Sequence, residues 1–228
     1  MPRTAAELAE VDEPAWPALL RAIGQAPVPV RVLPIDRAAG ERTLARLQVT
    51  TRSVLGALAL ECGGILVDHG WLRILGGGGG GGGGGHGIPG LASANAPRDP
   101  GDDPSPPGHL LVAWDVLGGR FAIDGGGLGV APGRVCYFAP DALRWESLDV
   151  GHGEFVHAMI GGGVTQFYDG MRWPGWEADC DSLGVGEGFA LWPPPFSVEG
   201  CDLALVSRRA VPIAELFAFY DDAADQLG

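Results

Sequence analysis

The chain has 228 residues, 46% of them hydrophobic and 19% charged, and carries a formal net charge of −13 at pH 7. This length suits one domain with a sizeable core. The acidic balance argues against nucleic-acid binding, because phosphate contacts need basic side chains, and against anionic membrane surfaces. A basic protein partner or a neutral ligand fits the charge better, although solubility alone also explains it.

The basic residues are all arginine, which excludes a phosphate-loop lysine, a Schiff-base lysine and a Ser–Lys dyad. Residues 1–10 lack the apolar core of a signal peptide, and no run of 18 apolar residues occurs. We therefore expect a cytoplasmic protein without a membrane span. The cysteines form no Cys-x-x-Cys pair, so we expect them to be reduced and buried, and we predict no metal site and no cofactor.

The N-terminal third is predicted to begin with helices and to continue into strands. Thr4 and Glu7 match a capping box. A second helix is expected to open at residues 12–14 and to end at Gly24. Pro29 indicates an edge strand, since it cannot donate a backbone hydrogen bond. The further predictions are a strand over 28–33, a helix over 34–47, a strand or short helix over 55–60, and strands over 65–67 and 71–75 joined by a tight turn at 68–70.

Ten consecutive glycines occupy residues 76–85, and a stretch rich in Pro and Asp follows them to residue 108. A glycine homopolymer specifies no defined turn, so a phosphate-binding loop is disfavoured. We predict that residues 76–108 form a flexible, disordered insertion within a single domain that spans residues 1–228.

The remainder of the chain is predicted to alternate short strands with glycine-rich connections before it returns to helices. Regular βαβ alternation is absent, so we predict an α+β fold with a largely antiparallel sheet flanked by helices. The expected elements are strands over 110–113, 121–123 and 134–138, helices over 152–160 and 164–176, an extended segment over 191–196, a strand over 203–207 and a helix over 212–227.

Six long motifs carry a family resemblance. They are residues 48–56, 63–76, 114–127, 137–146, 166–176 and 191–196. With these motifs the chain resembles a bacterial family defined only as a domain of unknown function, DUF2625, from about Glu7 to Phe196. The expanded decaglycine and Asp124, where we expect Asn, depart from the family pattern. Residues 110–161 also resemble the SMI1/KNR4-like (SUKH) superfamily, many members of which bind proteins and include immunity proteins against bacterial toxins. That resemblance implies protein binding.

The candidate site residues lie in separate parts of the sequence. Asp68 and His69 could orient a general base or hold a metal, although turn residues need no function. Thr51 and Arg52 could bind a carboxylate or a phosphate, or form a loop salt bridge. An aromatic and arginine-containing segment resembles a binding hot spot, but could equally fill the core. The candidates from that segment are Tyr168, Arg172, Trp173 and Trp176, and Trp71 and Asp124 complete the set.

Three functions remain open at this point. The sequence contains no Gly-x-Ser-x-Gly and no His-Glu-x-x-His motif, so we predict no catalytic residue and favour a non-enzymatic binding domain with a protein partner, of immunity type. The first alternative is a small hydrolytic enzyme that uses Asp68, His69 or Asp124 in a pocket near the aromatic segment. The second alternative is a domain that binds a small ligand.

Overall fold

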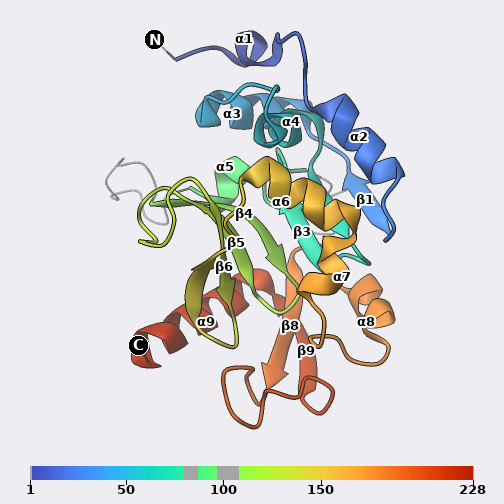
Figure 1. Cartoon of the computed structure of the whole chain (residues 1–228), viewed down its shortest axis with the longest axis vertical. Coiled ribbons are helices and arrows are strands. Elements are labelled where there is room, and N and C mark those ends of the chain that lie inside the picture. The colour runs from blue at the N-terminus through green and yellow to red at the C-terminus, as the bar shows by residue number, and fades with distance from the viewer. Residues whose placement is uncertain (1, 80–86, 97–107, 228) are drawn as a thin grey trace.

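A seven-stranded antiparallel sheet forms the centre of the computed structural model, which describes residues 2–79, 87–96 and 108–227 (Figure 1). The order of its strands follows the chain from β1 to β7, and a second antiparallel sheet pairs β8 with β9. The predicted α+β class with a largely antiparallel sheet is confirmed. The strands are β1 Val30–Leu33, β2 Gly64–Val67, β3 Leu72–Leu75, β4 His109–Asp115, β5 Arg120–Asp124, β6 Val135–Ala139, β7 Arg144–Ser147, β8 Glu187–Trp192 and β9 Ser207–Pro212.

Helices lie on both faces of the central sheet (Figure 1). The ring of Phe121 lies 4.9 Å from that of Phe155 in α6, whereas the adjacent Arg120 bonds Asp221 in α9 at 2.7 Å. Successive strand residues point to opposite faces, so α6 and α9 cover opposite faces. The helices are α1 Ala5–Ala9, α2 Trp16–Gly24, α3 Arg37–Leu47, α4 Val54–Glu61, α5 Leu91–Ala94, α6 His152–Ala158, α7 Val164–Phe167, α8 Trp176–Ser182 and α9 Ile213–Leu227.

Side-chain caps fix the starts of three N-terminal helices. The predicted capping box of Thr4 and Glu7 is confirmed at α1. Asp36 accepts hydrogen bonds from two backbone N–H groups at the start of α3. Ser53 accepts one from Gly56, and the ambiguous run over 55–60 therefore belongs to a helix, α4, whose residues from Gly56 to Leu60 are all buried.

Several predicted elements were wrong. The helix expected over 164–176 stops at Phe167, and a separate helix, α8, begins after Gly175, whose φ of 84° interrupts any continuation. The strand expected over 203–207 lies further along as β9, since Leu205 is 81% exposed and does not face the core. Strand β7 was not predicted. The four cysteines are free as expected, but Cys201 is exposed rather than buried.

The structure describes part of the predicted insertion at residues 76–108, and those parts are packed. Gly79 forms a β-bridge with Ile88, which is buried together with Leu91 of α5. A Cβ atom at Gly76 or Gly77 would collide with a backbone carbonyl oxygen, so these two glycines allow close backbone approach rather than free movement. The remainder of the predicted insertion, residues 80–86 and 97–107, lies outside the described residues.

Within the described ranges 2–79, 87–96 and 108–227, no helix has both the length and the apolar character needed to cross a membrane.

Candidate functional site

The turn between β2 and β3 places the Asp68–His69 pair. Asp68, His69 and Gly70 have φ angles of 53°, 56° and 76°, which confirms the predicted tight turn. The two side chains reach different elements rather than each other. The Asp68 carboxylate accepts a hydrogen bond from Arg172 at 2.6 Å, and His69 Nδ1 lies 3.0 Å from a carboxylate oxygen of Asp181 in α8.

Most of the candidate residues predicted from sequence meet around Trp71. The Arg172 guanidinium stacks over the Trp176 ring at 4.1 Å. The Trp71 ring lies 5.6 Å from the Tyr168 ring and 5.4 Å from the Trp173 ring. Trp71, Tyr168 and Trp173 are at most 2% exposed, so this cluster fills the core, as one of the two interpretations of the aromatic segment anticipated.

Thr51 and Arg52 do not belong to this cluster. The Thr51 hydroxyl donates to the Ala9 carbonyl oxygen at 3.1 Å, and its backbone N–H donates to Leu8. Thr51 thereby ties the N-terminal segment to the loop before α4. Arg52 is exposed and has no ion-pair partner in the part of the chain that the structure describes.

Asp124 lies at the opposite end of the sheet from the Asp68–His69 turn. It pairs with His109 at the start of β4, whereas Asp115 at the end of β4 pairs with Leu72 beside the turn. At about 3.3 Å per residue, the length of β4 separates the two ends by about 20 Å. Both oxygens of the Asp124 carboxylate already accept backbone hydrogen bonds, from residues 126, 128, 130 and 131. The structure therefore does not bring Asp124 to Asp68 and His69.

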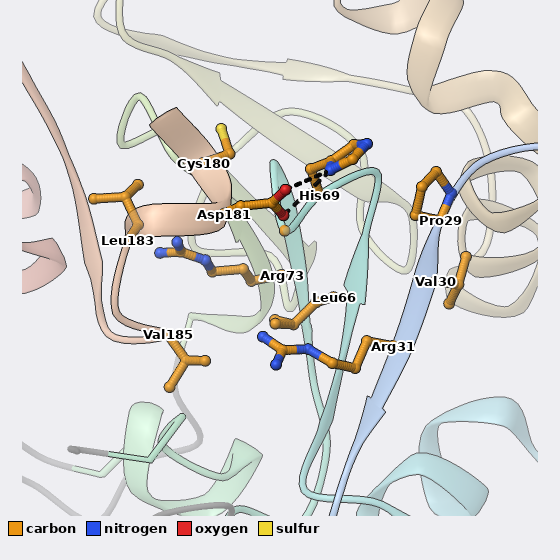
Figure 2. A pocket seen from close by; sticks show the side chains of 11 residues that line it. Pro29, Val30, Arg31, Leu66, His69, Arg73, Cys180, Asp181, Leu183 and Val185 are labelled. Atoms are coloured by element: carbon orange, nitrogen blue, oxygen red, sulfur yellow. Dashed lines mark hydrogen bonds and ion pairs between the residues drawn. The ribbon is translucent and has the colours of Figure 1, made fainter. Parts of the chain in front are cut away.

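A pocket of about 310 Å³ opens beside the turn, between strands β1 to β3 and the segment from α8 to residue 185 (Figure 2). The His69–Asp181 pair lies at one end of it, and Figure 2 shows Arg31 of β1 and Arg73 of β3, on either side of β2, extending toward Leu183 and Val185. The lining residues are Pro29, Val30, Arg31, Leu66, His69, Gly70, Arg73, Cys180, Asp181, Leu183 and Val185.

Arg73 is the most unusual residue in this lining, because its side chain is charged and only 1% exposed. One terminal nitrogen donates to the backbone carbonyl of Glu187, while Nε has no hydrogen-bond partner among the described residues. No carboxylate of those residues lies within salt-bridge distance of it, although the negative charges of Asp115 and Glu187 favour its charged form from further away. Burial lowers the pKa of Arg73 to about 10, so the guanidinium stays charged at neutral pH.

The other polar lining groups include a thiol and a carboxylate. Burial raises the pKa of the Cys180 thiol to about 12, so it is not a thiolate nucleophile at neutral pH. Asp181 is the single carboxylate of the lining, and His69 already contacts it. Among the residues that the structure describes, no group of three His, Cys, Asp or Glu side chains is arranged to hold a metal ion.

The chain matches the model of one known protein family. A family model described as "Protein of unknown function DUF2625" matches residues 5–216, nearly the whole length. The chain belongs to the DUF2625 family. This confirms the resemblance drawn from the sequence motifs, whereas the more remote likeness to the SUKH superfamily stays a prediction.

Two bacterial proteins are similar to this DUF2625 chain. The uncharacterised protein YbfG of Escherichia coli K12 is 37% identical over 192 residues, which cover 82% of each chain. An uncharacterised protein of Haemophilus influenzae is 35% identical over 191 residues, which cover 84% of this chain and 82% of the relative. No solved structure matches significantly.

Sequence reasoning missed two features of this DUF2625 chain. Arg73 could have been noticed as the single charge in an otherwise apolar strand, the run from Trp71 to Leu75. No comparable pattern in the sequence marked Asp115 as a buried residue. It is fully buried, accepts hydrogen bonds from the hydroxyls of Tyr137 and Tyr168 at 2.9 and 3.1 Å, and accepts two more from backbone N–H groups. Burial raises its pKa. Its oxygens are all engaged, so we assign it to the core rather than to the pocket.

Proposed function

We propose that this DUF2625 protein is a binding domain for a small anionic ligand, which occupies the pocket beside the β2–β3 turn. The observation that carries the proposal is the buried guanidinium of Arg73, which lines the pocket without a carboxylate partner. A buried charge without a directly bonded carboxylate is costly, and the more distant charges of Asp115 and Glu187 offset that cost only in part. A bound anion would offset that cost.

The chemistry of the lining supports the same class of ligand. A guanidinium is planar and donates parallel hydrogen bonds, which suits a carboxylate or a phosphate. Arg31 contributes a second guanidinium, and the apolar side chains of Leu66, Leu183 and Val185 complete the wall. A volume of about 310 Å³ falls at the small end of the range for metabolite pockets.

The earlier alternatives have weaker support. A hydrolytic enzyme that uses Asp68, His69 or Asp124 has less support, because Asp68 bonds Arg172, His69 contacts Asp181 and the Asp124 carboxylate accepts backbone hydrogen bonds at the other end of the sheet. A protein-recognition surface at the aromatic segment would need exposed rings, but Tyr168 and Trp173 are buried.

The test is ligand-dependent stabilisation of the purified chain. A ligand that binds only the folded state raises the melting temperature with its concentration. We expect inorganic phosphate and short-chain carboxylates to raise the melting temperature of the wild-type chain at constant ionic strength. Arg73→Met should lose this response while it remains folded, because Met replaces the apolar stem and removes a buried charge that no carboxylate contacts directly.

Two further variants make the test specific. Arg144→Met is the matched control, because Arg144 is an exposed arginine of β7 that pairs with Glu146 away from the pocket, and it should respond like the wild type. Arg73→Lys keeps the charge but loses the planar fork, so it should retain a weakened response. Equal stabilisation of the wild type and Arg73→Met would show only general salt effects on the protein and would reject the pocket as the site.

A further inference from the structure

Two arginines of the pocket occupy one row across the sheet. The strand register pairs Arg31 of β1 with Leu66 of β2, and Leu66 with Arg73 of β3. Directly paired residues project to the same face, so both arginines and the intervening leucine line the same side. Two strand spacings of 4.7–4.9 Å place the Cα atoms of the arginines about 10 Å apart.

The two guanidinium groups differ in depth. Arg73 lies inside the core at 1% exposure, whereas Arg31 is exposed at the mouth, and neither has an ion-pair partner among the described residues. Figure 2 shows both side chains extending toward Leu183 and Val185, with Leu66 between their stems. A ligand in the pocket therefore meets an inner cation and an outer cation separated by apolar surface.

We propose, on the basis of the anion-binding function above, that the natural ligand carries two separate anionic groups joined by a short apolar segment, as in a short-chain dicarboxylate. The inner carboxylate binds Arg73, the outer carboxylate binds Arg31, and the connecting carbons lie over Leu66 and against Leu183. Asp181 is exposed and paired with His69 at the end of the pocket. Asp115 and Glu187 act on Arg73 electrostatically, but their carboxylates accept other hydrogen bonds and do not line the pocket, so they leave the guanidinium available to the inner carboxylate.

The experiment compares three probes by isothermal titration at matched ionic strength: propionate with one carboxylate, glutarate with two, and inorganic phosphate as a compact anion. One additional charge-assisted contact corresponds to roughly a tenfold or greater gain in affinity. We therefore expect glutarate to bind at least about tenfold more tightly than propionate. Arg31→Gln, an exposed substitution that should not disturb folding, should reduce glutarate affinity to near that of propionate and leave propionate affinity unchanged.

The outcomes separate this inference from the proposed function. Arg144→Gln serves as the charge-matched control and should keep the wild-type preference for glutarate. Equal affinities for glutarate and propionate, or tighter binding of phosphate than of glutarate, would overturn the two-headed ligand while the anion-binding function stands. Failure of all three probes to bind the wild-type chain would overturn the function itself and this inference with it.

Discussion

Arg172 connects the turn beside the pocket to the aromatic core. Its guanidinium bonds the Asp68 carboxylate at 2.6 Å, with side-chain exposures of 15% for Arg172 and 7% for Asp68. The same group stacks over Trp176. The pair is thus largely removed from water, and the two charges depend on each other more than they would at a surface.

Removal of Arg172 should therefore be costly. Arg172→Met leaves the Asp68 carboxylate buried without a cation, and we expect a loss of about 3–5 kcal/mol in the free energy of unfolding, measured by urea denaturation. The double variant Asp68→Asn/Arg172→Met should recover part of that loss, because it buries no unpaired charge. The surface pair of Arg144 and Glu146, with exposures of 71% and 54%, provides the control, and Arg144→Met should cost less than about 1 kcal/mol. Equal losses for the two arginines would contradict this assignment.

Among the elements, the loop between β5 and β6 depends on one carboxylate. Asp124 Oδ1 accepts from the N–H groups of Gly126 and Leu128, and Oδ2 accepts from those of Val130 and Ala131. An asparagine, which the family resemblance led us to expect here, has one carbonyl oxygen and would turn an NH₂ group toward two of these donors. The structure therefore explains the Asp in this chain as the organiser of the loop.

Asp124→Asn tests this explanation. We expect a lower urea midpoint than for the wild type, because two backbone N–H groups of the loop lose their acceptor. Asp141→Asn makes the same change of charge at an exposed position in the β6–β7 turn and should leave the midpoint nearly unchanged. If both variants unfold at the same urea concentration, the four hydrogen bonds do not hold the loop.

Elements with strong local signals were predictable from sequence, and elements that depend on tertiary contacts were not. The capping box of Thr4 and Glu7 and the turn at Asp68–His69–Gly70 follow from local residue preferences. Helix α8 has no such cap, since Gly175 precedes it without a side-chain hydrogen bond. Instead, the Trp173 indole donates to Asp179 at 2.6 Å and fixes its first turn, a contact that periodicity does not reveal.

At the scale of the molecule, the pocket could not be derived from sequence because its parts are far apart in the chain. Arg31 and Arg73 become neighbours only through the pairing of β1, β2 and β3, and α8 closes the pocket from more than a hundred residues further on. The register of strands is a tertiary property. The sequence did indicate the aromatic and arginine residues that fasten α8 to the β2–β3 turn, and only their position in the core was left undecided.

The two sheets are fastened to each other as well. The Phe189 N–H of β8 donates to the Val116 carbonyl just after β4 at 2.7 Å, and Arg73 of β3 donates to the carbonyl of Glu187 in β8. Buried contacts that cross between the sheets favour a single cooperative unfolding transition, which is the behaviour of one domain. Global stability can then be measured as one quantity and followed with pH.

A buried histidine should make that global stability depend on pH. His152, at the start of α6, is 9% exposed, and neither ring nitrogen has a partner among the described residues. Burial lowers its pKa to about 4, below the usual value of 6.5. The unfolded chain therefore binds more protons than the folded chain between these values, so stability is fully present above pH 6.5 and falls progressively as the pH drops toward 4. Asp115 acts in the opposite direction, because its raised pKa favours proton uptake by the folded state.

The contribution of His152 can be isolated by substitution. As the pH falls from 7 to 5, the lowered pKa of His152 should reduce the free energy of unfolding by about 2 kcal/mol, measured by urea denaturation at each pH. His152→Leu should flatten the curve over this range by that amount, since it removes the ionisable group and leaves Asp115 in place. His157→Gln alters an exposed histidine of the same helix and should reproduce the wild-type curve. If the free energy of unfolding of His152→Leu follows pH in parallel with the wild type, His152 accepts a proton in the folded chain as easily as in the unfolded chain. That result would contradict its burial at the start of α6.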